Sequence, residues 1–326
     1  SFSSLDTIYI GGGTPSLLSV HDVESILKEI TNHFEIDRHA EITMEVNPGD
    51  VSLEYFQDLR HSGINRLNIG IQSFEDDILK FLGRRHSACE AVAAIHAARK
   101  AGFDNVGMDL MYGGHGQNVN KWKRTLQQAL NFSPDHLSCY QLSLDGNTPL
   151  FRRYKQERLC LPEENEALDF FMTTSQTLTQ AGYSHYEVSN FSRTEALISR
   201  HNTKYWRHMP YLGLGPCAHS FRENKRWWNK ADVDKYIKGI TEGKPPVEQS
   251  EELSTEQLAL EALFLGLRTK EGIDLEKYKI HYGMDLQSDK KQTLDALIEN
   301  NLVELKDGCL RSTLAGMAVA DSLALI

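Results

Sequence analysis

The stretch of sequence that decides the fold is Thr7-Ile8-Tyr9-Ile10-Gly11-Gly12-Gly13-Thr14-Pro15-Ser16. Its first residues are β-branched or aromatic and predict a buried parallel strand. The three glycines let backbone groups approach a ligand closely, because no Cβ stands in the way. Thr14 and Ser16 are typical helix caps, and Pro15 is allowed in a first helical turn. Alone, the stretch predicts only a tight strand-to-helix turn, since it lacks a dinucleotide fingerprint and a phosphate-loop lysine.

The same strand-then-helix pattern recurs over roughly 190 residues. Further strands are predicted at 41–46, 65–74, 105–112, 136–142 and 183–188, with helices at 21–34, 52–61, 87–100, 119–131 and 163–181 between them. Repeated alternation predicts parallel strands joined by helical crossovers. The sheet is then either open and doubly wound or a closed or partial barrel, and in both cases ligands bind at the carboxyl ends of the strands.

Polar residues stand at the carboxyl ends of these strands, namely Thr14, Glu45, Gln72, Asp109 and Gln141. Each one alone is typical of a turn or a cap. Five on successive strand ends indicate a binding site. The two carboxylates suit a ligand with an ammonium group and hydroxyls, and Arg84 or Arg85 can bind its carboxylate bidentately.

Residues 189–229 break the alternation and are unusually rich in His and Trp. They include the run Arg200-His201-Asn202-Thr203-Lys204-Tyr205-Trp206-Arg207-His208, followed by Cys217, His219 and Trp227-Trp228. Two interpretations stay open. These side chains either pack as a rim that closes the sheet, or they form a site for a flat apolar ligand with an imidazole or thiolate ready to bind metal.

The chain changes character beyond Lys244-Pro245-Pro246, which looks like a linker. Helices are predicted at 254–268, 272–282, 286–300 and 312–325, with a hairpin over 302–310 that turns at an Asp-Gly pair. This order is typical of a winged helix. Because acidic residues outnumber basic ones there, we expect a packing or lid role rather than DNA binding.

Composition sets further limits. The chain has 326 residues and a net charge of −10, which argues against a nucleic-acid partner. Its five cysteines (Cys89, Cys139, Cys160, Cys217 and Cys309) show no clustered spacing, which indicates reduced thiols and neither disulfides nor a locally encoded metal cluster. No apolar run reaches membrane-span length and no signal peptide is visible, so we expect a cytoplasmic protein.

Taken in order, the motifs resemble a known family. Gly11–Ser16, Glu45-Val46-Asn47-Pro48-Gly49, Ile69–Phe74, Leu82-Gly83-Arg84 and Asp109–Gly113 resemble the radical S-adenosylmethionine (SAM) proteins of the oxygen-independent coproporphyrinogen III oxidase group. Within that group, His201-Asn202-Thr203-Lys204-Tyr205-Trp206 matches the HNxxYW motif of the HemW haem chaperones, to which Tyr186–Phe191 and Tyr211–Pro216 are also similar. The resemblance covers essentially the whole chain.

The resemblance implies a partial (β/α)6 barrel over residues 1–190, a connecting region over 191–245 and a winged-helix-like α+β domain over 246–326. It implies that Gly12, Gly13 and Thr14 meet the methionine moiety of SAM, and that Glu45, Gln72, Arg84 and Asp109 complete the SAM pocket. It makes His201 the ligand of a haem iron, with Trp206, Trp227 and Trp228 flanking the macrocycle.

The family's CxxxCxxC motif, whose thiolates hold a [4Fe–4S] cluster, does not occur in these residues. We therefore expect the cluster ligands and the first β/α unit of the barrel to be absent from this chain. His115 also departs from the family pattern, because it lies in Gly113-Gly114-His115-Gly116-Gln117, where the family usually has Leu-Pro before the Gly-Gln. Cys217 departs as well, because the family usually has Gly at that position. We expect neutral drift at both positions.

The leading functional hypothesis is a haem chaperone that binds haem and transfers it to acceptor haemoproteins, a membrane protein met transiently among them, with SAM and the cluster in support. The alternative is an oxygen-independent coproporphyrinogen III oxidase, in which a radical from SAM starts the decarboxylation of propionate side chains. A winged-helix regulator with a ligand-sensing barrel is disfavoured by the acidic C-terminal segment. The sequence predicts no oligomeric state.

Overall fold

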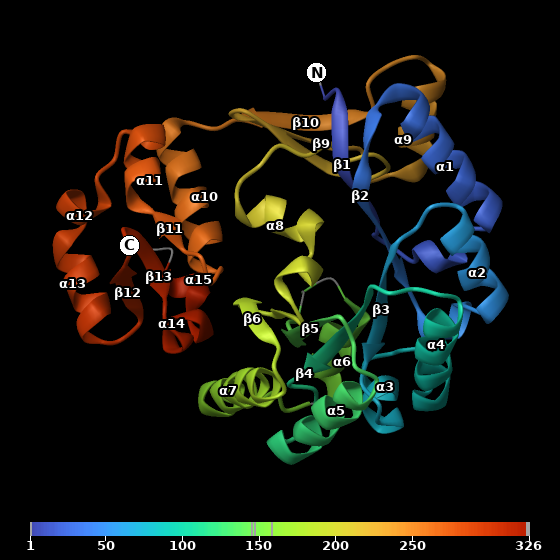
Figure 1. Cartoon of the computed structure of the whole chain (residues 1–326), viewed down its shortest axis with the longest axis horizontal. Coiled ribbons are helices and arrows are strands. Elements are labelled where there is room, and N and C mark those ends of the chain that lie inside the picture. Colours follow the sequence, from blue (N-terminus) through green and yellow to red (C-terminus); the bar gives the residue numbers. More distant parts are fainter. Residues whose placement is uncertain (1, 145, 147, 158, 324–326) are drawn as a thin grey trace. The chain divides into compact units, whose positions relative to one another are not determined.

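The computed structural model describes residues 2–144, 146, 148–157 and 159–323. The chain divides into two compact units, Ser1–Ser199 and Arg200–Ile326 (Figure 1). This division places most of the predicted connecting region, 191–245, in the C-terminal unit. The three-part division expected from the sequence stays a prediction.

The first unit is organised around one seven-stranded sheet, with the strand order β1-β2-β3-β4-β5-β7-β6. The strands are β1 (Ser4–Ile10), β2 (Glu35–Val46), β3 (Arg66–Gln72), β4 (Val106–Tyr112), β5 (His136–Gln141), β6 (Ser184–Glu187) and β7 (Asn190–Ser192). The helices are α1 (Val20–His33), α2 (Leu53–His61), α3 (Asp76–Phe81), α4 (Ala88–Lys100), α5 (Val119–Asn131), α6 (Pro149–Glu157) and α7 (Glu164–Gln180). Short 3-10 turns lie at Pro15–Leu17, Pro48–Asp50 and Glu195–Leu197.

Strands β1 to β5 are parallel, and the sheet curls into part of a barrel (Figure 1). The partial barrel expected from the sequence is therefore confirmed. Two details differ. β6 was expected to continue the parallel series, and β7 was not expected. They form a hairpin and β7 pairs antiparallel with β5, because only Val188 and Ser189 separate them and so short a link cannot make a parallel crossover.

The helix starts follow local capping chemistry. Ser87 and Glu90 form the expected capping box of α4. The expectation that Thr14 or Ser16 caps the first helix was wrong, because Ser19 and Asp22 form the capping box of α1. Ser16 instead joins two turns, since its hydroxyl accepts from the Asn47 backbone N–H at 3.1 Å and donates to Asp50 at 3.1 Å.

One face of the sheet is apolar and carries the core of the unit. Alternate residues of the strands, such as Met44, Ile69, Met108 and Leu137, are fully buried on this face. Helices α1, α2, α4, α5 and α7 supply the other half of this core. Each fully buried aliphatic side chain contributes roughly 1.5–3 kcal/mol, so this packing is the main source of the unit's stability.

The opposite face of the sheet is polar although much of it is buried. The residues that alternate with the core include Thr7, Tyr9, Thr43, Glu45, Arg66, Asn68, Gln72, Asp109, His136 and Ser138. Glycines on this face make room for them. A Cβ at Gly107 would lie 2.6 Å from Asn68 Oδ1, and one at Gly11 would lie 2.6 Å from the ring of Tyr9. The inner face is therefore shaped by its polar side chains.

The second unit holds two three-stranded antiparallel sheets, β10-β9-β8 and β11-β13-β12. The strands are β8 (His219–Arg222), β9 (Lys225–Asn229), β10 (Val247–Glu252), β11 (Ile273–Asp274), β12 (Val303–Lys306) and β13 (Cys309–Ser312). The helices are α8 (Arg200–Trp206), α9 (Val233–Thr241), α10 (Thr255–Leu267), α11 (Leu275–Tyr282), α12 (Leu286–Asp289), α13 (Lys291–Glu299), α14 (Leu314–Ala318) and α15 (Ala320–Leu323).

The winged-helix-like arrangement is present, with its hairpin turning at Asp307 and Gly308, both at positive φ as a two-residue hairpin loop requires. The single helix expected at 286–300 is broken at Lys290, whose φ of −121° is not helical. The helix expected at 312–325 begins after Ser312, which pairs with Val303, and it breaks at Val319; residues 324–326 lie outside the described residues.

The expected helix at 272–282 begins only at Leu275, because Ile273 and Asp274 pair with β13. Lys244-Pro245-Pro246 lies between α9 and β10 in the second unit. Among the described helices, none is long and apolar enough to cross a membrane.

We predict that Gly107→Ala lowers the free energy of unfolding of the protein by about 1–3 kcal/mol, because the new Cβ displaces the buried Asn68 side chain. Chemical denaturation followed by circular dichroism measures the change. Gly114→Ala is the matched control, since its Cβ would make only ordinary contacts at 3.4 Å with Phe81. Equal stability of the two variants would contradict the close packing of the inner face.

Candidate functional site

The turn after β1 forms the first part of the candidate site. Gly12 and Gly13 have φ values of 78° and 62°, a left-handed conformation that favours glycine. A Cβ at either position would meet nothing within 4 Å. The backbone here is therefore open to a ligand. Thr14 follows, and its side chain makes no capping bond, while its carbonyl accepts from the Leu17 N–H at 3.1 Å.

Glu45 lies beside this turn at the end of β2. The hydroxyl of Tyr9 donates to Glu45 Oε1 at 2.6 Å, and the backbone N–H of Gly12 donates to Glu45 Oε2 at 3.3 Å. Burial, together with the negative charge of Glu45, raises the pKa of Tyr9 far above its ordinary value, so the phenol remains a donor. These two bonds fix the Glu45 carboxylate next to the open glycine backbone.

Asp109 projects from β4 onto the same face. Asn68 Nδ2 donates to Asp109 Oδ2 at 2.7 Å. Burial raises the pKa of Asp109 to about 6, and the negative charge of Glu45 adds to the rise. Hydrogen bonding from Asn68 and Ser138 and the positive charge of Arg66 oppose it. Keeping the buried Asp109 carboxylate ionised therefore costs free energy of folding.

Gln72 and Arg84 complete the predicted group. Gln72 ends β3 with a φ of 62°, which is unusual for a non-glycine residue, and its buried Oε1 has no partner among the described residues. Arg84 Nη1 donates to Asn47 Oδ1 at 3.4 Å. Burial lowers the pKa of Arg84, and the negative charge of Asp109 opposes that shift. Arg84 and Asp109 therefore share one electrostatic environment.

These positions fit a small zwitterionic ligand such as SAM. An open glycine backbone and Glu45 lie at the carboxyl ends of β1 and β2, whereas Asp109, expected at the end of its strand, lies in the middle of β4 and shares its electrostatic environment with Arg84. The buried acceptor of Gln72 has a hydrogen-bonding capacity that a ligand or water would satisfy. His201 belongs to the second unit and is described separately below.

Several inner-face residues were not predicted from the sequence. Tyr9, Asn68 and Ser138 hold the predicted carboxylates, and Arg66 supplies a buried positive charge. A signal for them exists in the sequence. Strands buried on both faces read as continuous apolar runs, whereas these strands alternate polar and apolar residues. That alternation indicates a polar interior as well as polar strand ends.

The cysteines do not fit an iron–sulfur cluster. Cys139 is buried in the core, Cys89, Cys160 and Cys217 are exposed, and Cys309 is intermediate. Among the residues that the structure describes, no three His, Cys, Asp or Glu side chains gather as a metal site. Cys217 adopts a φ of 59°, a left-handed conformation that favours glycine. The ring of His115 accepts from the Cys160 backbone N–H at 3.2 Å.

Helix α8 places the predicted haem ligand in the second unit. His201 and Tyr205 are one turn apart on the same face of α8. His201 Nε2 and the Tyr205 hydroxyl are hydrogen-bonded at 3.0 Å, and their rings meet edge to face at 5.2 Å. Tyr205 also packs edge to face on Tyr211 at 4.6 Å. The motif is therefore tied to aromatic neighbours.

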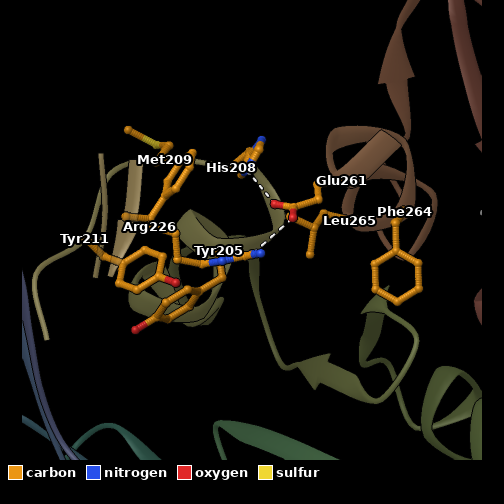
Figure 2. A pocket seen from close by; sticks show the side chains of 9 residues that line it. Tyr205, His208, Met209, Tyr211, Arg226, Glu261, Phe264 and Leu265 are labelled. Atoms are coloured by element: carbon orange, nitrogen blue, oxygen red, sulfur yellow. Dashed lines mark hydrogen bonds and ion pairs between the residues drawn. The ribbon is translucent and has the colours of Figure 1, made fainter. Parts of the chain in front are cut away.

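A pocket with a volume of about 330 Å³ adjoins Tyr205 (Figure 2). Its lining is mostly apolar or aromatic and consists of Tyr205, His208, Met209, Tyr211, Phe221, Arg226, Glu261, Phe264 and Leu265. His208 stacks on Phe221 at 4.5 Å with the rings nearly parallel. The pocket lies directly against the HNxxYW helix, because Tyr205 belongs to both.

The polar groups of the pocket are already paired with one another. Figure 2 shows Glu261 between His208 and Arg226, at 3.3 Å from His208 Nε2 and 3.0 Å from Arg226 Nη1. Arg226 also contacts Glu251 at 2.6 Å. Burial lowers the pKa of His208 while Glu261 opposes the shift, so His208 is neutral near pH 7. The rest of the lining is aromatic, apart from Met209 and Leu265.

The chain is similar to known proteins in both sequence and fold. Residues 2–129 match the family model of the radical SAM superfamily, and residues 253–319 match that of the HemN C-terminal domain. The solved structure of coproporphyrinogen III oxidase (HemN) from Escherichia coli is similar in fold, with a TM-score of 0.84 at 22% identity over 99% of this chain and 77% of that chain.

Curated relatives match nearly the whole sequence. Heme chaperone HemW of Lactococcus lactis is 34% identical over 92% of this chain and 78% of its own length. Heme chaperone HemW of Bacillus subtilis is 31% identical over 98% and 84%. The mitochondrial radical S-adenosyl methionine domain-containing protein 1 of Bos taurus is 35% identical over 98% and 75%. On this similarity, which spans both units, the chain belongs to the HemW family of the radical SAM superfamily.

Proposed function

We propose that this chain is a haem chaperone, which binds haem and transfers it to acceptor haemoproteins. The observation that carries the proposal is His201 on α8, in an HNxxYW motif beside an aromatic pocket, in a member of the HemW family. Imidazole is a common axial ligand of haem iron, and aromatic rings pack well against a flat apolar ligand.

In this proposal His201 ligates the iron and the rings of Tyr205, Tyr211 and Phe221 contact one edge of the macrocycle. Because Arg226 is already paired with Glu251 and Glu261, we expect the haem propionates to face solvent and not this pocket. Trp206, Trp227 and Trp228 remain candidates for further contacts with the macrocycle.

We propose that SAM binds at the carboxyl ends of β1 to β4. The backbone of Gly12, Gly13 and Thr14 meets its methionine moiety, and Arg84 binds its carboxylate. Glu45, Gln72 and Asp109 take the amine and ribose hydroxyls. When bound with a reduced [4Fe–4S] cluster, SAM supplies a radical. The described cysteines do not fit such a cluster, so the proposal assigns no cleavage step to this chain.

The proposed partners are haem and acceptor haemoproteins in the cytoplasm, including a membrane-bound acceptor met transiently. A nucleic-acid partner is not proposed, since the net charge of −10 would repel phosphates.

We predict that His201→Ala weakens haem binding at least about tenfold, because the iron loses its axial imidazole. Titration with haem, followed by absorbance in the Soret region, gives the affinity and the ligation state. His21→Ala is the control, since it removes an exposed imidazole from α1, away from the HNxxYW segment in the sequence.

Equal haem affinity of wild type and His201→Ala would remove His201 as the ligand. Failure of the wild type to bind haem would refute the chaperone proposal, and formation of a decarboxylated porphyrinogen by cluster-loaded protein would support the oxidase instead.

We predict that Asp109→Asn stabilises the ligand-free protein at neutral pH and weakens SAM binding about ten- to hundredfold, since a charged hydrogen-bond acceptor is lost. The folded pKa of about 6 lies above the ordinary value of 3.8, so the unfolded chain ionises first and the buried carboxylate disfavours folding. The stability gain should be on the order of 2 kcal/mol above pH 6 and should decline as the pH falls toward 4.

Denaturation at pH 8 and pH 4 measures this gain, and calorimetric titration measures SAM affinity. Asp104→Asn, at an exposed position, should leave stability within about 0.5 kcal/mol of wild type. A stability gain that is the same at both pH values would show that the buried charge is not its cause.

A further inference from the structure

The spacing of the HNxxYW motif has a structural consequence. Residues four apart on a helix face each other, so the motif pairs its His with its Tyr along one side of α8. The pairing is direct, because the Tyr205 hydroxyl lies 3.0 Å from His201 Nε2. If Nε2 carries no proton, the hydroxyl donates to its lone pair; if it carries one, Nε2 donates to the hydroxyl oxygen.

Either arrangement blocks ligation of iron by this nitrogen. An imidazole binds a metal through a nitrogen lone pair, and the hydroxyl occupies the position that the iron would take. Haem binding through His201 Nε2 therefore requires the Tyr205 hydroxyl to leave. The hydrogen bond to Tyr205 and the bond to iron therefore cannot both form at His201 Nε2.

Once displaced, the Tyr205 hydroxyl can hydrogen-bond to water. Tyr205 is 36% exposed, so its hydroxyl can turn to water and no polar group is left buried without a partner. Its ring keeps contact with Tyr211 and the pocket.

We propose that Tyr205 competes with haem iron for His201 Nε2 and thereby weakens the hold of the protein on its haem. This inference rests on the proposed function and adds how the site lets its cargo go. A carrier has to release haem to its acceptor. A neighbouring hydroxyl that takes over the vacated nitrogen stabilises the haem-free state, and so favours release.

The test compares wild type with Tyr205→Phe, which removes the hydroxyl and keeps the ring. We expect haem affinity to rise about three- to tenfold, the range that one neutral hydrogen bond accounts for. We expect release to apomyoglobin, followed by absorbance, to slow by a similar factor. The Soret spectrum should keep the position of the wild type, because His201 remains the ligand.

Two further variants sharpen the comparison. Tyr282→Phe removes a tyrosine hydroxyl from α11 of the same unit, outside the pocket lining, and should leave affinity and release rate unchanged. Adding Tyr205→Phe to His201→Ala should change neither haem affinity nor release rate, because His201 Nε2 is no longer present.

The outcomes separate this inference from the proposed function. Haem binding that is unchanged or weaker in Tyr205→Phe would overturn the competition and leave the chaperone function standing. Weaker binding in particular would mean that Tyr205 orients His201, which would then ligate iron through Nδ1. A wild-type protein that binds no haem would overturn both.

Discussion

The first unit depends on one constraint, the opposite chemistry of the two faces of its sheet. The outer face buries Met44, Ile69 and Met108 under helices and supplies the free energy of folding. The inner face keeps buried polar atoms such as Asn68 Oδ1 and Gln72 Oε1, which have no partner among the described residues. Each such atom costs about 1–3 kcal/mol. The apolar packing on the outer face offsets this cost, and the protein therefore stays folded with a polar inner face.

In the second unit, the short helix α8 has to be held in place by contacts with other elements. Helix α8 has seven residues, too few for an isolated helix to be stable in water. Its orientation therefore depends on tertiary contacts, which include Tyr205 against Tyr211 and the neighbouring His208 against Phe221. The paired polar groups His208, Glu261 and Arg226 fix the end of this segment against α10. The same aromatic rings that fix the motif also line the pocket beside it.

The repeat of strands and helices, with clear caps as at Ser87 and Glu90, predicted parallel strands joined by helical crossovers, and the choice of a partial barrel came from the family resemblance. The sequence could not predict that β7 pairs antiparallel with β5, since strand direction there depends on a short hairpin and on tertiary pairing. It named Glu45 and Asp109 from their place at strand ends, but not Tyr9 or Asn68, which act by contacts across strands. The bond between His201 and Tyr205 follows from helix geometry only once residues 200–206 are known to be helical.

The glycines of the inner face carry a consequence for anyone who engineers this fold. Replacing glycine by alanine commonly stabilises a protein by reducing the entropy of its unfolded chain. At Gly11 and Gly107 this route is closed, because each new methyl group would collide with a side chain that hydrogen-bonds the carboxylate of Glu45 or Asp109. Stabilising substitutions are therefore better sought on the solvent-facing sides of the outer helices, where a new side chain meets no buried neighbour.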